Sequence, residues 1–462
     1  MNAILQSRAD GTADDTSPTT PFGVQEQGLL RFITAGSVDD GKSTLIGRLL
    51  FDSKGIFADQ LAALSRAKNT RTVGDAVDLS LLTDGLEAER EQGITIDVAY
   101  RYFATPLRKF IVADTPGHVQ YTRNMVTGAS TADAAVVLVD VTRLTFSELN
   151  GVLTAGLLSQ TKRHTAIAAR LGLPAVIFAV NKMDLVGFDQ AKFDAARRAV
   201  EALATSVGIQ ETHVLPLSAL TGDNVVTASA HTPWYAGAPL LSLLERLPSR
   251  ADRLGTGAQQ CTARFPVQMV ARHDGHKADD FRGYMGRLAT GALRVGDELR
   301  VLPNGQNAQL SRIVRGGLDI EAASAGECLT LVLDRDLDIS RGDQLVLAQD
   351  AQPPVVGKRV RADICWLDQE ALSPARKYLL KHASRTVQAK LQTITYVLDI
   401  ETLSQSSQTD TVAMNDIARI ELLLAQPIVA DAYTLSPSTG SFILIDPATN
   451  HTVAAGMIVA LP

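Results

Sequence analysis

The chain is poor in cysteine and has no long apolar run. Only three cysteines, Cys261, Cys328 and Cys365, occur in 462 residues, and no two of them form a C-x-x-C pair. This spacing argues against a disulfide framework or a zinc site and fits a reducing cytosol. We therefore expect a cytoplasmic protein whose cysteines fill hydrophobic cores. No stretch reaches the roughly 18 apolar residues that span a bilayer, so no membrane association is expected.

An excess of basic charge is also absent. The 50 acidic residues outnumber the 44 basic ones, and the net charge of −6 gives no general attraction to nucleic acid. Residues 1–27 carry several acids and no apolar segment, unlike a secretory signal or a transit peptide, and predict a flexible tail. The remaining length is more than one hydrophobic core organises, so several domains are expected.

Apolar patterning divides the rest of the chain into three predicted domains. Residues 28–250 alternate nearly continuous apolar strands, such as 133–141, with helical stretches, such as 193–208. That order predicts an α/β domain with a doubly wound, mostly parallel sheet. Short alternating strands separated by turn residues follow, and they predict two β-barrels over residues 256–350 and 355–462.

The stretch GSVDDGKST, at residues 36–44, follows an apolar strand and opens an amphipathic helix. It has the G-x-x-x-x-G-K-[ST] pattern of a phosphate-binding loop, for which an ordinary glycine-rich turn is the alternative. Backbone N–H groups would point at phosphate oxygens, Lys42 would reach the β- and γ-phosphates, and the Ser43 hydroxyl would bind Mg²⁺. The expected nucleotide-binding residues here are Gly36, Ser37, Val38, Asp39, Asp40, Gly41, Lys42, Ser43 and Thr44.

The motif DTPGH, at residues 114–118, follows a second apolar strand. Asp114 at the end of that strand can hold the water shell of Mg²⁺, and the Gly117 amide can contact the γ-phosphate. His118, one residue further, lies where a group that orients the attacking water must sit. Read singly, DTPG is a common turn and a lone histidine after it is often only structural.

A third motif, NKMD at residues 181–184, indicates which base is bound. The Asp184 carboxylate can accept hydrogen bonds from guanine N1–H and the 2-amino group, a donor pair that adenine lacks. Asn181 can bond the base, and the stem of Lys182 can cover its face. A backbone amide within Ser218, Ala219 and Leu220, after the next strand, would meet the guanine oxygen. Because the motifs occur in order and each follows a strand, they predict a GTPase domain.

The segment between the phosphate loop and DTPGH contains the candidate switch. A mobile segment there should supply a second Mg²⁺ ligand only when the γ-phosphate is present, and Thr95 is the candidate. The alternative for Thr95 is an ordinary edge-strand threonine.

These motifs, with GITI at residues 93–96, resemble the translation-factor class of GTPases, such as elongation factor Tu, which also has an α/β domain and two β-barrels. Longer stretches, including residues 84–103 and 117–130, resemble the family of the GTP-binding large subunit of bacterial sulfate adenylyltransferase (CysN). That family uses GTP hydrolysis to drive a partner subunit that makes adenosine 5′-phosphosulfate and pyrophosphate from ATP and sulfate. The resemblance implies GTP and Mg²⁺ as ligands, a small catalytic partner of the CysD type, and a role in sulfate assimilation.

Several roles follow only from the resemblance. It implies that His118 positions the hydrolytic water beside an apolar gate of Val38 and Ile94, and that Asp39 helps coordinate a monovalent cation. Residues 141–159 are longer than the usual link in this class, which puts the local partner surface in doubt.

Two rival functions stay open at this point. The three-domain plan also suits a carrier that delivers aminoacyl-tRNA to ribosomes, with residues 376–385 as a phosphate-contacting strip, although a solvated strand face explains that strip equally. A GTP-dependent scaffold without productive turnover is the other rival. Shared fold alone does not decide among them.

Overall fold

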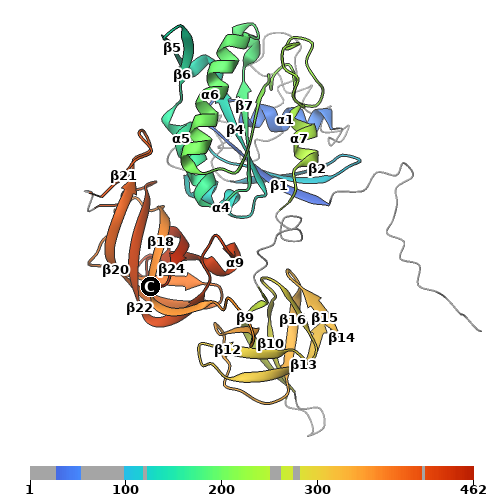
Figure 1. Cartoon of the computed structure of the whole chain (residues 1–462), viewed down its shortest axis with the longest axis vertical. Coiled ribbons are helices and arrows are strands. Elements are labelled where there is room, and N and C mark those ends of the chain that lie inside the picture. Colours follow the sequence, from blue (N-terminus) through green and yellow to red (C-terminus); the bar gives the residue numbers. More distant parts are fainter. Residues whose placement is uncertain (1–27, 54–97, 118–121, 250–261, 274–280, 408–410) are drawn as a thin grey trace, which may run out of the picture.

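The computed structural model of the chain describes residues 28–53, 98–117, 122–249, 262–273, 281–407 and 411–462. These residues form an α/β domain followed by two β-barrels (Figure 1), which confirms the predicted fold class. The predicted tail, residues 1–27, lies outside the described part. Within that part, no helix combines the length and apolar character needed to cross a membrane.

The α/β domain is organised by a six-stranded sheet in the order β2-β3-β1-β4-β7-β8. Its strands are β1 (Leu29–Ala35), β2 (Ala99–Ala104), β3 (Lys109–Asp114), β4 (Ala134–Asp140), β7 (Ala175–Asn181) and β8 (Glu211–Pro216). Only the β2–β3 pairing is antiparallel. Because β1 pairs with β3 on one side and β4 on the other, the carboxyl ends of the parallel strands open at a topological switch point, where such sheets bind ligands.

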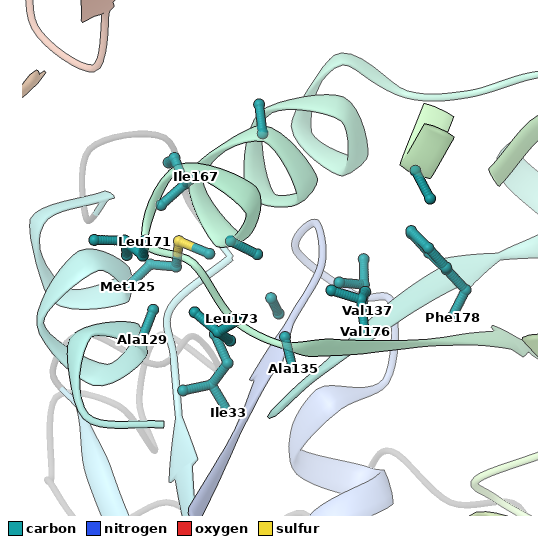
Figure 2. Packing of buried hydrophobic residues seen from close by; sticks show 14 of the residues in the cluster. Ile33, Met125, Ala129, Ala135, Val137, Ile167, Leu171, Leu173, Val176 and Phe178 are labelled. Carbon is teal, nitrogen blue, oxygen red and sulfur yellow. The ribbon is translucent and has the colours of Figure 1, made fainter. Parts of the chain in front are cut away.

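Helices cover both faces of this sheet, as the apolar strands require. They are α1 (Lys42–Asp52), α4 (Thr122–Ser130), α5 (Ser159–Arg170), α6 (Gln190–Val207) and α7 (Leu240–Arg246). One core packs α1 and α7 on one face, and a second core packs α4, α5 and α6 on the other. Figure 2 shows Met125 of α4 and Ile167 of α5 in this second core, above Ile33 and Ala135 of the strands. The predicted helical stretch 193–208 is α6, which ends at Gly208 with a φ of 85°.

The extra segment at residues 141–159 forms a short turn and a β-hairpin. Strands β5 (Thr145–Leu149) and β6 (Val152–Gly156) pair with each other and with no strand of the central sheet. The hairpin projects from the α/β domain beside α6 (Figure 1). Arg198 of α6 anchors it by donating a hydrogen bond to Leu153 O at 2.8 Å.

The first barrel, barrel II, closes because β12 pairs with both β17 and β13. Its strands are β9 (Arg264–His273), β10 (Phe281–Arg287), β12 (Glu298–Leu302), β13 (Asn307–Arg315), β16 (Cys328–Leu333) and β17 (Gln344–Leu347), with β14 (Leu318–Ile320) beside β13. A separate two-stranded pair is formed by β11 (Ala292–Arg294) and β15 (Ala322–Ser324).

The second barrel, barrel III, closes in the same way, because β19 pairs with both β23 and β20. Its strands are β18 (Val355–Trp366), β19 (Lys377–His382), β20 (Arg385–Leu398), β22 (Ile417–Ala430), β23 (Ser441–Ile445) and β24 (Thr452–Ala460). The short strand β21 (Gln405–Ser406) pairs with β20, and the one-turn helix α9 (Pro437–Gly440) precedes β23. Burial alternates along β19 and β23, and the buried side chains of all six strands fill the interior, as expected for a small barrel.

The expectation that every cysteine fills a core is wrong for Cys328. Cys365 is buried, but Cys328 is exposed at the start of β16. Side chains alternate along a strand, and Leu329, Leu331 and Leu333 take the inward positions of β16, so Cys328 points outward. Cys261 lies outside the described residues.

The three domains are joined by buried polar contacts. Arg264 of barrel II is 1% exposed and binds Asp350 at 2.5 Å and Asp431 of barrel III at 3.2 Å. Helix α5 contacts barrel III, where the Tyr433 hydroxyl donates to Leu171 O at 2.9 Å. The core on the α5 side of the sheet continues directly into barrel III residues.

Candidate functional site

The loop between β1 and α1 curls around its own lysine. Lys42 Nζ donates hydrogen bonds to Ser37 O at 2.7 Å and Gly36 O at 3.2 Å. Burial lowers the pKa of Lys42, while nearby carboxylates oppose the shift. The ammonium group is thus held inside the loop by carbonyl oxygens, which an anionic oxygen at the loop mouth can replace.

Asp40 braces the same loop from within. Its Oδ2 accepts a hydrogen bond from the Ser37 N–H at 2.5 Å, and its side chain is fully buried. Burial raises the pKa of Asp40 from 3.8 to about 6, although Lys42 and Arg143 draw it down. Asp39 beside it is exposed with a φ of 65°, while Val38 and Thr44 are half-buried. The structure gives Asp40 a structural role in the loop that its position in the motif does not reveal.

Ser43 and Asp114 meet across the loop, as the motifs predict. Ser43 Oγ lies 3.3 Å from Asp114 Oδ2, and Thr34 Oγ1 donates to Asp114 Oδ1 at 3.1 Å. β1 and β3 are neighbours in parallel, so their carboxyl ends bring the two motifs together. A hydroxyl and a carboxylate oxygen at one point are the hard oxygen ligands that Mg²⁺ prefers. The residues present therefore fit the ion.

Gly117 lies directly against the phosphate loop. A Cβ at this position would be 2.4 Å from Lys42 Nζ and 2.7 Å from the carbonyl carbon of Ser37, so only glycine allows the approach. The DTPG turn thus lies directly beside the phosphate loop. His118, Thr95 and Ile94 lie outside the described residues.

The guanine motif is tied to the phosphate loop through Asn181. Its Nδ2 donates to Asp40 O at 2.7 Å, and its Oδ1 accepts from the Ala219 N–H at 2.9 Å. A Cβ on Gly41, whose φ is 94°, would lie 2.5 Å from Asn181 Nδ2. One side chain therefore links the phosphate loop to the Ser218-Ala219-Leu220 turn. The sequence motif predicts a base contact for Asn181 and does not reveal this link.

Two charged side chains of the NKMD motif, Lys182 and Asp184, lie where a nucleotide base could contact them. Lys182, at a φ of 62°, is held by an ion pair with Asp140 at 2.7 Å. Asp184 Oδ1 is buried and accepts no hydrogen bond from the described residues. Ser218 is buried, whereas Leu220 is 57% exposed beside it. An orphaned buried carboxylate oxygen calls for a donor, which the ring edge of guanine would supply.

Arg48 of α1 closes this side of the site. It donates to the carbonyl oxygens of Ala219 and Leu220 and forms an ion pair with Asp52 one turn away. Helix α1, which begins at the phosphate loop, therefore also holds the Ser218-Ala219-Leu220 turn. Nothing in the α1 sequence distinguishes Arg48 from an ordinary surface arginine.

Two further residues that the motifs do not include support the phosphate loop. His164 of α5 is 1% exposed, and its Nδ1 accepts the Gly36 N–H at 3.0 Å. Burial, reinforced by Lys42, lowers the pKa of His164 to about 3, so the ring is neutral. Arg143, just after β4, donates to Val38 O at 2.7 Å and lies 3.6 Å from Asp40 Oδ1. Neither residue carries a sequence signal, because both are distant along the chain.

Comparison with known proteins agrees with this geometry. Residues 27–251 match the family described as the elongation factor Tu GTP binding domain, and residues 359–459 match the GTP-eEF1A C-terminal domain-like family. Sulfate adenylyltransferase subunit 1 of Shewanella oneidensis is 48% identical over 441 residues, covering 94% of this chain and 86% of that protein.

Two other likenesses complete the comparison. The bifunctional enzyme CysN/CysC of Mycobacterium tuberculosis is 48% identical over 432 residues, covering 93% of this chain and 67% of that protein. The crystal structure of sup35 with GMPPNP aligns at a TM-score of 0.41 and 20% identity, over 94% of this chain and 95% of that one. By its full-length identity to such relatives, the chain belongs to the sulfate adenylyltransferase subunit 1 (CysN) family, and its α/β domain is a GTP-binding domain of the elongation factor Tu type.

Proposed function

We propose that this chain is the GTP-hydrolysing subunit of a cytoplasmic sulfate adenylyltransferase. It couples GTP hydrolysis to the formation of adenosine 5′-phosphosulfate and pyrophosphate from ATP and sulfate in a small, CysD-type partner subunit. The observation that carries the proposal is 48% identity along 94% of the chain to a sulfate adenylyltransferase subunit 1, together with a complete set of phosphate and guanine motifs at one sheet edge.

The phosphate end of the site binds by exchanging internal contacts for ligand contacts. Lys42 is desolvated and held by two carbonyls, so a β- or γ-phosphate oxygen in their place gains a charge-assisted hydrogen bond in a low-dielectric setting. The backbone amides of residues 36–44 add further donors at the N-terminus of α1. The loop is preorganised for this by Asp40, Arg143 and His164.

Ser43 and Asp114 are the proposed Mg²⁺ residues, with Thr95 as the second hydroxyl ligand. When bound, Mg²⁺ neutralises charge on the β- and γ-phosphates. Asp114 is fixed by Thr34 and acts through its water shell. Asp39, exposed at the loop mouth, is the proposed contributor to a monovalent cation site.

Guanine is proposed to lie between Lys182 and the turn at residues 218–220. The orphaned Asp184 Oδ1 accepts from the base edge, and Lys182, pinned by Asp140, covers the ring. Asn181 reaches both motifs, so base binding and phosphate-loop geometry share one side chain. This arrangement favours GTP over ATP because adenine offers no matching donor pair.

For hydrolysis we assign His118 to orienting the attacking water, with Val38 and Ile94 as the apolar gate and the Gly117 amide contacting the γ-phosphate. These assignments rest on the family resemblance and on the position of Gly117 against Lys42. Coupling to the partner requires a two-state element, and moving such an element from 1:99 to 99:1 takes about 5.5 kcal/mol. Release of the γ-phosphate contacts at Thr95 and Gly117 is the proposed source.

The test measures GTP turnover by the purified chain, alone and with the small subunit, ATP and sulfate. We expect GTP hydrolysis to rise in the complete mixture and adenosine 5′-phosphosulfate to accumulate only when GTP is hydrolysed. His118→Ala should lower GTP turnover about 100- to 1,000-fold without weakening GTP binding. Full function in the His118→Ala variant would favour a scaffold instead, and stimulation by ribosomes and aminoacyl-tRNA would favour the carrier.

A further inference from the structure

We propose that the outer face of barrel III binds an acidic surface of the second subunit of the sulfate adenylyltransferase. The inference rests on the proposed function, which supplies that partner. The surface, called here the basic face, consists of Arg359, Lys377, Lys381, Lys390 and Leu423.

Strand register places these residues together. Arg359 of β18 lies opposite Leu423 of β22, Leu423 opposite Lys390 of β20, and Lys390 opposite Lys377 of β19. Side chains in one such cross-strand row point to the same face of a sheet. Lys381 lies four residues along β19 from Lys377 and therefore shares that face. All five residues are exposed, so the face is the outer one.

The basic face contains no acidic residue. Uncharged residues occupy the positions between its cations: Leu379, Thr386, Gln388 and Ala425. None of its cations forms an ion pair with another residue of the described part of the chain. The nearest outward acid along β22, Glu421, is already bound to Arg361.

Such segregation of charge is costly for the free subunit. Like charges directly opposite each other on adjacent strands are destabilising, and Lys377 and Lys390 are such a pair. The chain as a whole carries a net charge of −6, so this cluster runs against its general charge. An acidic surface packed across β19, β20, β22 and β18 would relieve this repulsion. The positive potential of the face would also attract the acidic surface during association.

The internal interfaces of the protein leave the basic face uncovered. The α/β domain packs against the far ends of the same strands, at Cys365 of β18, Leu398 of β20 and Ile417 of β22. Barrel II contacts the β19–β20 turn, where Ser384 donates to Val267 O. Barrel II also reaches the start of β20, where Arg385 pairs with Asp343 at 3.5 Å, five residues before Lys390.

A protein partner fits the basic face better than nucleic acid does. Leu423, 40% exposed, lies in the middle of the row between Arg359 and Lys390. An apolar residue surrounded by charged residues matches the apolar core and polar rim of a protein–protein interface. Four cations are few for a polyanion, whose binding depends on the number of phosphates neutralised, and the net negative charge repels it at long range.

The test uses the full chain and the small subunit of the same enzyme, with affinity measured by calorimetry at low and high salt. Lys377→Glu/Lys390→Glu should weaken the complex at least tenfold at low salt, and the difference should shrink at high salt because exposed charges are screened. Arg294→Glu changes an exposed arginine of barrel II and should leave the affinity within twofold of wild type. Leu423→Ser should weaken binding at both salt concentrations.

Unchanged affinity in the double variant would overturn the inference. A second result would also overturn it: wild type binds bulk tRNA, the double variant does not, and both bind the small subunit equally. The basic face would then bind nucleic acid and not the small subunit. GTP affinity and the unfolding midpoint serve as controls and should not change. The proposed function itself fails if the wild-type chain does not bind the small subunit and its GTP turnover does not respond to that subunit. Equal binding of wild type and double variant rejects only the basic face.

Discussion

His164 of α5 accepts a hydrogen bond from the Gly36 N–H of the phosphate loop, although the two residues are 128 positions apart. The pairing gives a buried backbone donor its acceptor. It also connects the nucleotide site to a helix whose far end contacts barrel III through Leu171 and Tyr433. The position of the phosphate loop thus depends on α5 as well as on β1 and α1.

Removing this acceptor should weaken nucleotide binding. In His164→Ala the Gly36 N–H stays buried without a partner, at a cost of about 1–3 kcal/mol, which corresponds to roughly a 5- to 150-fold loss of GDP affinity. Titration calorimetry with GDP measures the change. His213→Ala, which removes a half-exposed histidine of β8, is the matched control and should bind GDP normally. Wild-type affinity in His164→Ala would show that α5 does not support the loop.

The buried Asp40 should make stability depend on pH. Its folded pKa of about 6 exceeds the unfolded value of 3.8, so the folded state binds more protons between these values, and the free energy of unfolding falls as pH rises from 3.8 to 6. Asp40→Asn removes that penalty and should be more stable than wild type at pH 7.5, by at most about 3 kcal/mol, and equal to it below pH 3.8. Urea unfolding at several pH values tests this, with exposed Asp39→Asn as the control.

The two buried titrating groups of the loop have opposite effects on stability. His164 has a folded pKa of about 3 against an unfolded 6.5, so the unfolded chain binds the extra proton and stability falls as pH drops from 6.5 toward 3. Between pH 3.8 and 6 the two contributions oppose each other. In Asp40→Asn the loss of stability with acid should therefore become steeper, and an unchanged slope would contradict the assignment for Asp40.

Changing Asp184 should change base preference. In Asp184→Asn the carboxylate acceptors for guanine N1–H and the 2-amino group are replaced by an amide that has only one acceptor oxygen. Two charge-assisted hydrogen bonds are lost or weakened, so GTP affinity should fall about 100-fold or more. XTP, which carries an oxygen in place of the 2-amino group, should bind the variant better than it binds wild type. Competition against a fluorescent nucleotide reports both, and Asp194→Asn on the surface of α6 is the control.

Arg264 should be essential for the junction of the two barrels. Arg264→Met leaves the carboxylates of Asp350 and Asp431 buried without their cation, which costs about 3–5 kcal/mol. Thermal unfolding should show a lowered midpoint for the barrels. Arg312→Met breaks the exposed pair with Asp319 and should cost at most about 1 kcal/mol. Equal effects of the two substitutions would mean that the buried cluster adds nothing to stability.

The residues of the candidate nucleotide site could be predicted from the sequence, because their chemistry is local. The phosphate loop needs glycine at positions 36 and 41 and lysine at 42 whatever surrounds it, and apolar periodicity places each motif at a strand end. The same periodicity predicted the α/β domain and the two barrels. The meeting of Ser43 with Asp114 followed from the rule that parallel strands present their carboxyl ends at one edge.

Other features were decided only by the tertiary structure. Periodicity tells which face of a helix or strand is buried but not which residue it meets, so nothing in the sequence pairs His164 with Gly36, Asn181 with Ala219, or Arg143 with Val38. The outward position of Cys328 and the row of cations on barrel III likewise depend on strand register. Composition and motif determine which chemistry this chain can perform, while long-range packing determines which side chains hold that chemistry in place, because contacts between distant residues form only when the whole chain folds.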